Sequence, residues 1–172
     1  AYNVTGGGSY CSGGAGVAVG LSDSDAGINY TLYLNGTATA NVVAGTGNAI
    51  SFGSITAAGT YTVVATNAST TCVNNMTGSV TVTVLALPTA YSVTGGGSYC
   101  SGGTGVTVGL SGSQTGVNYV LYLNSVSTGN TVPGTGSAIS FGNQTTAGTY
   151  TVVATNTTSG CVNNMTSSQT VS

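Results

Sequence analysis

The sequence predicts an all-β protein made of two tandem β-sandwich modules with about seven strands each. Three observations carry this prediction. Residues 1–83 align with residues 90–172 without a gap, at an offset of 89 and with 58 identical pairs in 83. In short runs, β-branched and aromatic residues alternate with small or polar ones, which is the period-two pattern of half-buried strands. Clusters of Gly, Asn, Ser and Asp separate the runs, and turns at such short spacing are typical of a β-sandwich.

The strands of the first module can be placed in order along its sequence. Five runs show the alternation clearly: Val17, Val19 and Leu21; Tyr30, Leu32 and Leu34; Ile50 and Phe52; Tyr61, Val63 and Ala65; and Val80, Val82 and Val84. Turn-forming clusters bound these runs at Gly6–Gly8, Ser22–Gly27, Asn35–Thr37, Gly45–Asn48, Ala57–Gly59 and Ala68–Thr71. Gly and Asn adopt the backbone angles that tight turns require. No segment shows helical periodicity.

The repeat also predicts the domain boundaries. Module 1 covers residues 1–84, a short linker covers 85–89, and module 2 covers 90–172. The linker has one Pro and no Gly/Ser run, so we expect it to be semi-rigid. The last strand of module 2 stops at Ser172, the counterpart of Thr83, which suggests that the two modules belong to a longer array.

The composition excludes most kinds of chemistry. The chain has no Lys, Arg, His or Glu, and its only charged side chains are Asp23 and Asp25. Acid–base catalysis and activated nucleophiles need titratable groups, so we expect no enzyme and no catalytic residue. Nucleic-acid binding depends on Lys and Arg and is not expected. No apolar run is long enough to span a bilayer, so membrane insertion is not expected either. Nothing indicates a cofactor or a resident metal.

The four cysteines are Cys11, Cys72, Cys100 and Cys161, and each module contains one pair. Four cysteines allow three pairings. The repeat favours Cys11–Cys72 and Cys100–Cys161, because each module then closes itself, with a stabilisation of about 4 kcal/mol per bond. Metal binding is the alternative, but it lacks CxxC spacing and histidine. Structural disulfides indicate an extracellular location.

Two tyrosines are candidate structural sites, and one acidic cluster is a candidate ligand site. Tyr61 and Tyr150 each follow a Gly by two residues at the start of a strand, the pattern of a tyrosine corner, with ligand stacking as the alternative. Asp23 and Asp25 suggest either a solvated loop tip or a local calcium site. The glycine-rich residues 6–14 lack the GK[ST] ending of a phosphate loop and predict a tight connection between strands.

Several motifs together resemble one family. They are Tyr10-Cys11-Ser12-Gly13-Gly14, the tyrosine-rich run 29–36, Gly59-Thr60-Tyr61 and Cys72, each with a counterpart in module 2. They resemble the tandem immunoglobulin-like (Ig-like) repeats of large Bacteroidota surface proteins, which look like type IX secretion cargo and include adhesins and gliding-type cell-surface filament proteins. Leu32 and Leu121 stand where many such modules carry Trp. The resemblance implies Ig-like sandwiches and export to the cell surface.

The function expected from the sequence is structural. We expect a repeat unit of an extracellular filament or adhesin stalk, which gives reach and self-association at the cell surface. Its partners would be other copies of itself or neighbouring repeats, and surface glycans are a further candidate partner. The alternative is a carbohydrate-binding β-sandwich module in which Tyr2, Tyr10 or Tyr33 form a flat stacking surface. Ice binding through Thr81 and Thr83 is weaker, because two threonines are too few to match a lattice.

Overall fold

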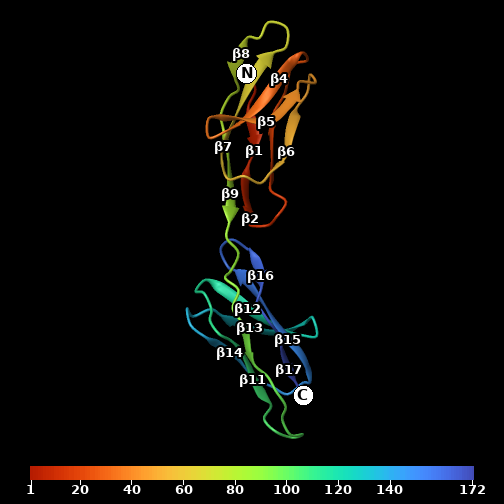
Figure 1. Ribbon diagram of the computed structural model, residues 1–172, viewed down its shortest axis with the longest axis vertical. Coiled ribbons are helices and arrows are strands. Elements are labelled where there is room, and N and C mark those ends of the chain that lie inside the picture. Colours follow the sequence, from red (N-terminus) through yellow and green to blue (C-terminus); the bar gives the residue numbers. More distant parts are fainter. The chain divides into compact units, whose positions relative to one another are not determined.

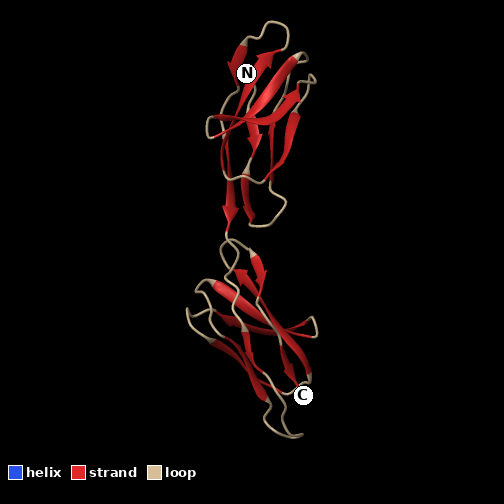
Figure 2. Ribbon diagram, in the orientation of Figure 1, coloured by secondary structure: helices blue, strands red, loops and turns tan.

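The computed structural model describes all 172 residues, Ala1–Ser172, and every regular element in it is a β-strand. Figure 2 shows strands connected by loops without any helix. Accordingly, the chain has no helix with the length and apolarity needed to cross a bilayer. The all-β prediction is confirmed. The chain divides into two compact units, Ala1–Leu85 and Ala86–Ser172.

The first unit has nine strands in two sheets (Figure 1). One sheet has the order β1-β3-β6, and the other has the order β2-β9-β7-β4-β5 with β8 paired to β7. The strands are β1 (Val4–Gly6), β2 (Gly8–Cys11), β3 (Val17–Leu21), β4 (Ile28–Leu34), β5 (Thr37–Ala44), β6 (Ile50–Ile55), β7 (Gly59–Asn67), β8 (Val73–Asn75) and β9 (Val80–Leu85). The five runs identified in the sequence correspond to β3, β4, β6, β7 and β9, and the count exceeds seven because β1, β2, β5 and β8 lie outside them.

Between β1 and β2 the chain switches from one sheet to the other at Gly6 and Gly7. β1 pairs antiparallel with β3, whereas β2 pairs parallel with β9 in the opposite sheet. Gly6 and Gly7 have φ angles of 88° and 73°. A Cβ atom on Gly6 would lie 2.1 Å from the carbonyl oxygen of Ala18. Only glycine fits at this position, because it tolerates positive φ and has no side chain to collide with the neighbouring strand.

The second unit repeats the arrangement with eight strands. Its sheets have the orders β10-β11-β14 and β13-β12-β15-β16, with β17 paired to β15. The strands are β10 (Val93–Gly95), β11 (Val106–Leu110), β12 (Val117–Leu123), β13 (Val126–Pro133), β14 (Ile139–Gln144), β15 (Gly148–Asn156), β16 (Val162–Asn164) and β17 (Gln169–Val171). A counterpart of β2 is reduced to one bridge between Gly97 and Val171. In the first unit, β2 pairs over four residues with Val82–Leu85 of β9.

Each unit has its own hydrophobic core between its two sheets. The alternating residues of the predicted runs point inward: Tyr30 and Leu32 on β4 are each 1% exposed. Their counterparts Tyr119 and Leu121 are both fully buried. The tyrosine hydroxyls remain hydrogen-bonded, because Tyr30 accepts from the backbone N–H of Asp25 at 2.9 Å. The sandwich therefore forms with Leu32 and Leu121 at these core positions.

The chain enters and leaves the first unit at opposite ends of the sandwich. Ala1 lines the same hollow as Asn67 and Cys72 at the far end of β7. We call this end the N-terminal pole. The last strand leaves beyond the other end of β7, where Gly59 pairs with Val82 and the chain continues to Leu85. We call that end the C-terminal pole. Nine residues of β7, at about 3.3 Å each, separate the two poles by about 30 Å.

The second unit has the same polarity. Tyr91 accepts a hydrogen bond from Thr166 near the Asn156 end of β15, and Val171 pairs with Gly148 at the other end. Ser172 therefore lies at the C-terminal pole of its unit. Leu85 ends β9, and the second compact unit begins at Ala86.

The turn between β4 and β5 generates a stability prediction. Asn35 and Gly36 have φ angles of 48° and 82°, as a two-residue hairpin turn with both central residues at positive φ requires. In the second unit the same turn holds Asn124 and Ser125, at 47° and 67°. Ser125→Gly should stabilise the chain by roughly 1 kcal/mol, because it relieves a left-handed residue that carries a side chain.

Urea denaturation of the full chain measures this effect. The repeat supplies the matched control, since Gly36→Ser should destabilise the first unit by a similar amount. A Ser125→Gly chain that is no more stable than the parent would contradict the turn geometry.

Candidate functional site

Tyr61 and Tyr150 are tied to the backbone. The Tyr61 hydroxyl donates to the carbonyl oxygen of Ala57, four residues upstream, at 2.8 Å. Tyr150 makes the same bond to Thr146, also at 2.8 Å. Both rings are buried, and burial raises the pKa of both hydroxyls above the ordinary tyrosine value. The geometry is that of a tyrosine corner, and it leaves neither hydroxyl free to contact a ligand.

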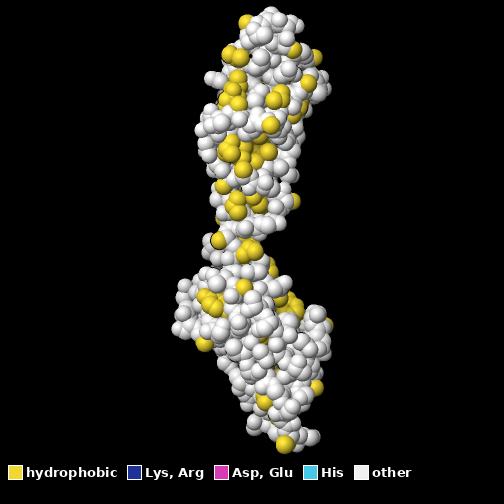
Figure 3. Space-filling view, viewed as in Figure 1, with side chains coloured by type: hydrophobic (Ala, Val, Ile, Leu, Met, Phe, Trp, Pro, Cys, Tyr) yellow, Lys and Arg dark blue, Asp and Glu magenta, His cyan; other side chains and the backbone are white.

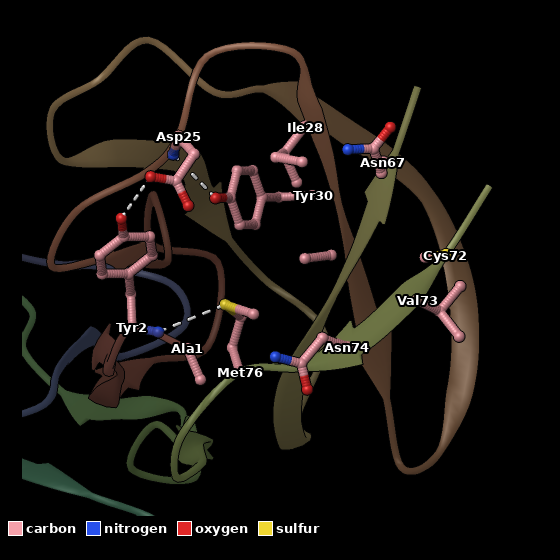
Figure 4. Close-up of a pocket in the computed structure, with 11 residues that line it drawn as sticks. Ala1, Tyr2, Asp25, Ile28, Tyr30, Asn67, Cys72, Val73, Asn74 and Met76 are labelled. Carbon is pink, nitrogen blue, oxygen red and sulfur yellow. Dashed lines mark hydrogen bonds between the residues drawn. The ribbon is translucent and has the colours of Figure 1, made fainter. Parts of the chain in front are cut away.

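A hollow of about 180 Å³ opens at the N-terminal pole of the first unit (Figure 4). Tyr2 and Asp25 line one side, and Val73 and Asn74 on β8 line the other, with Cys72 beside them. The Tyr2 hydroxyl donates to Oδ1 of Asp25 at 2.6 Å, and the Tyr2 N–H points to the Met76 sulfur at 3.4 Å. Apolar side chains therefore line the hollow together with four polar residues: the carboxylate of Asp25, the amides of Asn67 and Asn74, and Cys72.

The hydrogen bond to Asp25 dominates the titration of Tyr2. Together with smaller contributions from burial and from the charges of Asp25 and Asp23, it raises the pKa of Tyr2 from 10.0 to about 12. A phenol that donates to a carboxylate loses that bond and meets a like charge when it ionises. Asp25 therefore fixes the N-terminal segment to the loop before β4.

The same position in the second unit holds the connector between the units. Asn163, the counterpart of Asn74, donates from its side-chain amide to the Pro88 carbonyl at 2.7 Å. Gln114, the counterpart of Asp25, accepts from the Thr89 N–H at 2.5 Å. The N-terminal pole is therefore built to receive an incoming chain. The sequence pattern did not reveal this role, because Asp25 and Gln114 differ in charge and their partners lie far apart in sequence.

The predicted disulfide pairing is wrong. Cys72 and Cys100 are free and exposed, whereas Cys11 and Cys161 are each disulfide-bonded. Neither Cys11–Cys72 nor Cys100–Cys161 forms. A disulfide requires Cα atoms within about 7 Å of each other.

Strand register explains why the pairs within a unit cannot close. Cys11 ends β2 opposite Leu85, at the C-terminal pole. Cys72 follows β7 and accepts a hydrogen bond from Asn67 through its carbonyl, at the N-terminal pole. The length of β7, about 30 Å, lies between them. Cys100 and Cys161 are separated in the same way in the second unit, where Tyr99 bonds to Ser172 and Asn156 bonds to Cys161.

The other candidate ligand sites have local structural roles. Asp23 accepts a hydrogen bond from the N–H of Ser24 at 2.8 Å, and Asp25 accepts from Tyr2. No group of three or more His, Cys, Asp or Glu side chains is present in the chain. The glycine-rich residues 6–14 form the strand switch and its following turn.

The three tyrosines proposed as a stacking surface do not gather. Tyr2 lies at the N-terminal pole and bonds to Asp25. Tyr10 lies on β2 near the C-terminal pole, where its hydroxyl donates to the carbonyl oxygen of Thr56. Tyr33 pairs with Thr62 in the middle of the sheet, and all three rings are only half-exposed.

Comparison with known proteins finds similarity only among solved structures. No protein-family model matches the chain, and no curated protein matches it. The structure is similar to a chain of the mouse coronavirus receptor-binding domain complexed with its murine receptor, at 15% identity, covering 99% of each chain with a TM-score of 0.49. It is also similar to the Clostridium thermocellum CbhA fibronectin(III)-like modules, at 12% identity over 98% of this chain and 93% of that chain, with a TM-score of 0.45. Murine CEACAM1b matches at 15% identity over 95% and 94%, with a TM-score of 0.41.

These scores are too low to support an argument about function. The fold assignment rests on strand order instead. The first unit is an Ig-like β-sandwich by three features. Its sheets have the orders β1-β3-β6 and β2-β9-β7-β4-β5, β2 pairs parallel with β9 after the switch, and the Tyr61 hydroxyl bonds to the backbone.

Removing the corner hydroxyl should destabilise each unit. Tyr150→Phe leaves the Thr146 carbonyl without its partner, and we expect a loss of roughly 1–3 kcal/mol in the free energy of unfolding. Tyr61→Phe should cost a similar amount through Ala57. Urea denaturation measures both, with Tyr33→Phe and its counterpart Tyr122→Phe as controls on the sheets of Tyr61 and Tyr150. Losses no larger than those of the controls would show that the corner bond is not stabilising.

Removing the carboxylate at the hollow should shift the titration of Tyr2. In Asp25→Asn the pKa of Tyr2 should fall from about 12 toward 10.0, because the charged acceptor is gone. Since the folded-state pKa is raised, the stability it contributes is complete below pH 10 and is lost as the pH rises through about 12.

Ultraviolet titration of tyrosinate in the parent chain, with the curve of Tyr2→Phe subtracted, isolates this group. A Tyr2 that ionises at the same pH in the parent and in Asp25→Asn would rule out the assigned cause.

Proposed function

We propose that this chain is a structural repeat unit of an extracellular filament or adhesin stalk. It provides reach at the cell surface and associates with further copies or with neighbouring repeats. The placement of the termini within each unit carries the proposal. Because the chain enters at one pole and leaves at the other, every unit added to such a chain adds its own length of about 30 Å.

The surface chemistry supports a structural role over a catalytic one. The face in Figure 3 shows scattered hydrophobic side chains on a polar, uncharged background. The chain has no Lys, Arg or His and only two carboxylates, of which Asp25 is hydrogen-bonded to Tyr2. General acid–base chemistry has almost no groups to use. The chain is therefore proposed to be non-catalytic and to act without a cofactor.

The low charge of the surface also supports the proposed association of one copy with another. A formal net charge of −2 on 172 residues produces little mutual repulsion. Neutral hydroxyl and amide groups form contacts that salt screens only weakly. The disulfide supports an extracellular location, because such bonds persist in oxidising compartments. The motif resemblance to type IX-secreted adhesins and gliding-type filaments agrees with this location.

Carbohydrate binding has less support as the alternative function. Its candidate residues Tyr2 and Tyr10 lie at opposite poles of the unit, and their hydroxyls bond within the protein. A stacking platform needs aromatic faces that share one exposed surface.

Length addition tests the proposal directly. Tandem chains in which Ser172 is joined to the next Ala1 through the connector sequence 84–89 should increase in maximum dimension with each added unit, by about 30 Å or more. Small-angle scattering of chains with increasing numbers of units measures this dimension. Because the tether is covalent, the result does not depend on any disulfide between chains.

A maximum dimension that stops rising as units are added would contradict the stalk. Binding in a glycan array that is lost in Tyr33→Ala would favour the carbohydrate alternative.

A further inference from the structure

We propose that the hollow at the N-terminal pole of the first unit is a receiving site for the connector of a preceding repeat. The occupant is an uncharged, extended segment with the chemistry of residues 86–89, joined to the amino group of Ala1. Asn74 donates to the carbonyl oxygen of its second-last residue, and Asp25 accepts from the N–H of its last residue. The proposal rests on the function proposed above and specifies how a neighbouring repeat is recognised.

The second unit shows how such a segment is held. Pro88 and Thr89 belong to this unit, and they directly precede the residues that repeat the first unit. The Asn163 side-chain amide donates to the Pro88 carbonyl oxygen at 2.7 Å, and Oε1 of Gln114 accepts from the Thr89 N–H at 2.5 Å. Two consecutive residues are therefore bound through their backbone, the first as an acceptor and the second as a donor, by side chains of the same unit.

The chain enters both units along the same path. In the first unit the Thr77 N–H donates to the Tyr2 carbonyl oxygen at 2.8 Å, and the Tyr2 N–H points to the Met76 sulfur at 3.4 Å. In the second unit the counterparts of these three residues make the same two contacts, at 2.9 and 3.3 Å. Because both sides of this tyrosine are fixed alike, a segment joined to Ala1 extends from it in the direction that Thr89 takes in the second unit.

The groups that would hold the segment are unused in the first unit. Asn74 is exposed, and its side-chain amide makes no hydrogen bond within the protein. The Tyr2 hydroxyl occupies Oδ1 of Asp25, which leaves Oδ2 without a donor. Around the hollow in Figure 4, Ala1 lies between Tyr2 and Asn74. A segment that arrives at Ala1 therefore meets a free amide donor and a free carboxylate oxygen.

The order of acceptor and donor sets a sequence rule for the segment. The residue next to Ala1 must supply an N–H to Asp25, so proline does not fit there. The residue before it supplies only its carbonyl oxygen, so proline fits, as Pro88 does in the second unit. The bond to the Asp25 carboxylate is charge-assisted, whereas the bond to Gln114 is neutral. Residues 86–89 obey this rule and carry no charge that the carboxylate would repel.

The test uses the full chain extended at Ala1 by Leu-Ala-Leu-Pro-Thr, the sequence of residues 85–89. Amide hydrogen exchange followed by NMR reports on the N–H of the added threonine. This N–H should exchange roughly tenfold more slowly than in a free peptide of the same sequence, because exchange requires the bond to Asp25 to open. The Thr89 N–H of the same molecule is the reference for an amide that is held in this way.

Two controls separate the receiving site from general ordering of the extension. A swapped extension, Leu-Ala-Leu-Thr-Pro, has the same composition and changes nothing in the folded unit. Its last residue has no N–H to donate, so its threonine N–H should exchange at the rate of the free peptide. Asn74→Ala in the chain with the original extension removes the donor to the carbonyl and should abolish most of the protection. This variant should fold, because Asn74 is exposed, and its Thr89 N–H should keep its protection.

An added threonine that exchanges as fast as in the free peptide would overturn the proposal, and so would protection that persists in full in Asn74→Ala. If tandem chains still lengthen with each added unit in that case, only the receiving site fails and the stalk function stands. If the added threonine is protected but tandem chains do not lengthen, the proposed function fails and the receiving site remains.

Discussion

The glycine switch near the start of each unit is the constraint on which the rest of the structure depends. At Gly6 and Gly7 the first strand leaves the sheet of β3 and joins β9 in the opposite sheet. A side chain on Gly6 would collide with the Ala18 carbonyl, and one on Gly95 would collide with that of Thr107. Because of the switch, the N-terminal strand follows the sandwich from pole to pole and brings Cys11 to the end where the chain leaves the unit.

Neutral hydrogen bonds take the place of ion pairs in this chain. Ser24 is buried, yet its hydroxyl donates to Asn48 at 2.6 Å and accepts from the N–H of Thr46 at 2.9 Å. Ser113 makes the matching bonds in the second unit. No buried side-chain nitrogen or oxygen is left without a partner. A fold whose buried polar groups are satisfied in this way needs no ion pairs for stability.

Much of the fold could be predicted from local pattern. The alternation of Tyr30 and Leu32 with polar residues identifies their inward face, because side chains of a strand alternate between its two faces. The Asn35-Gly36 turn and the Gly-X-Tyr corner depend on residues within a few positions of each other. The candidate sites were harder to predict. Asn163 and Gln114 bind the connector through contacts between residues distant in sequence, and nothing in their local sequence indicates this role.

The sequence by itself determined a duplicated all-β chain, its turns, its inward-facing residues and its lack of catalytic groups, because these follow from composition and short-range periodicity. Only the tertiary structure decided the role of the cysteines. The repeat made a bond within each unit the simplest pairing, but strand direction and register place Cys11 and Cys72 at opposite poles. Which ends of the strands meet is a non-local property, since it depends on how the strands pair across the whole sandwich and not on the spacing of two residues in the chain.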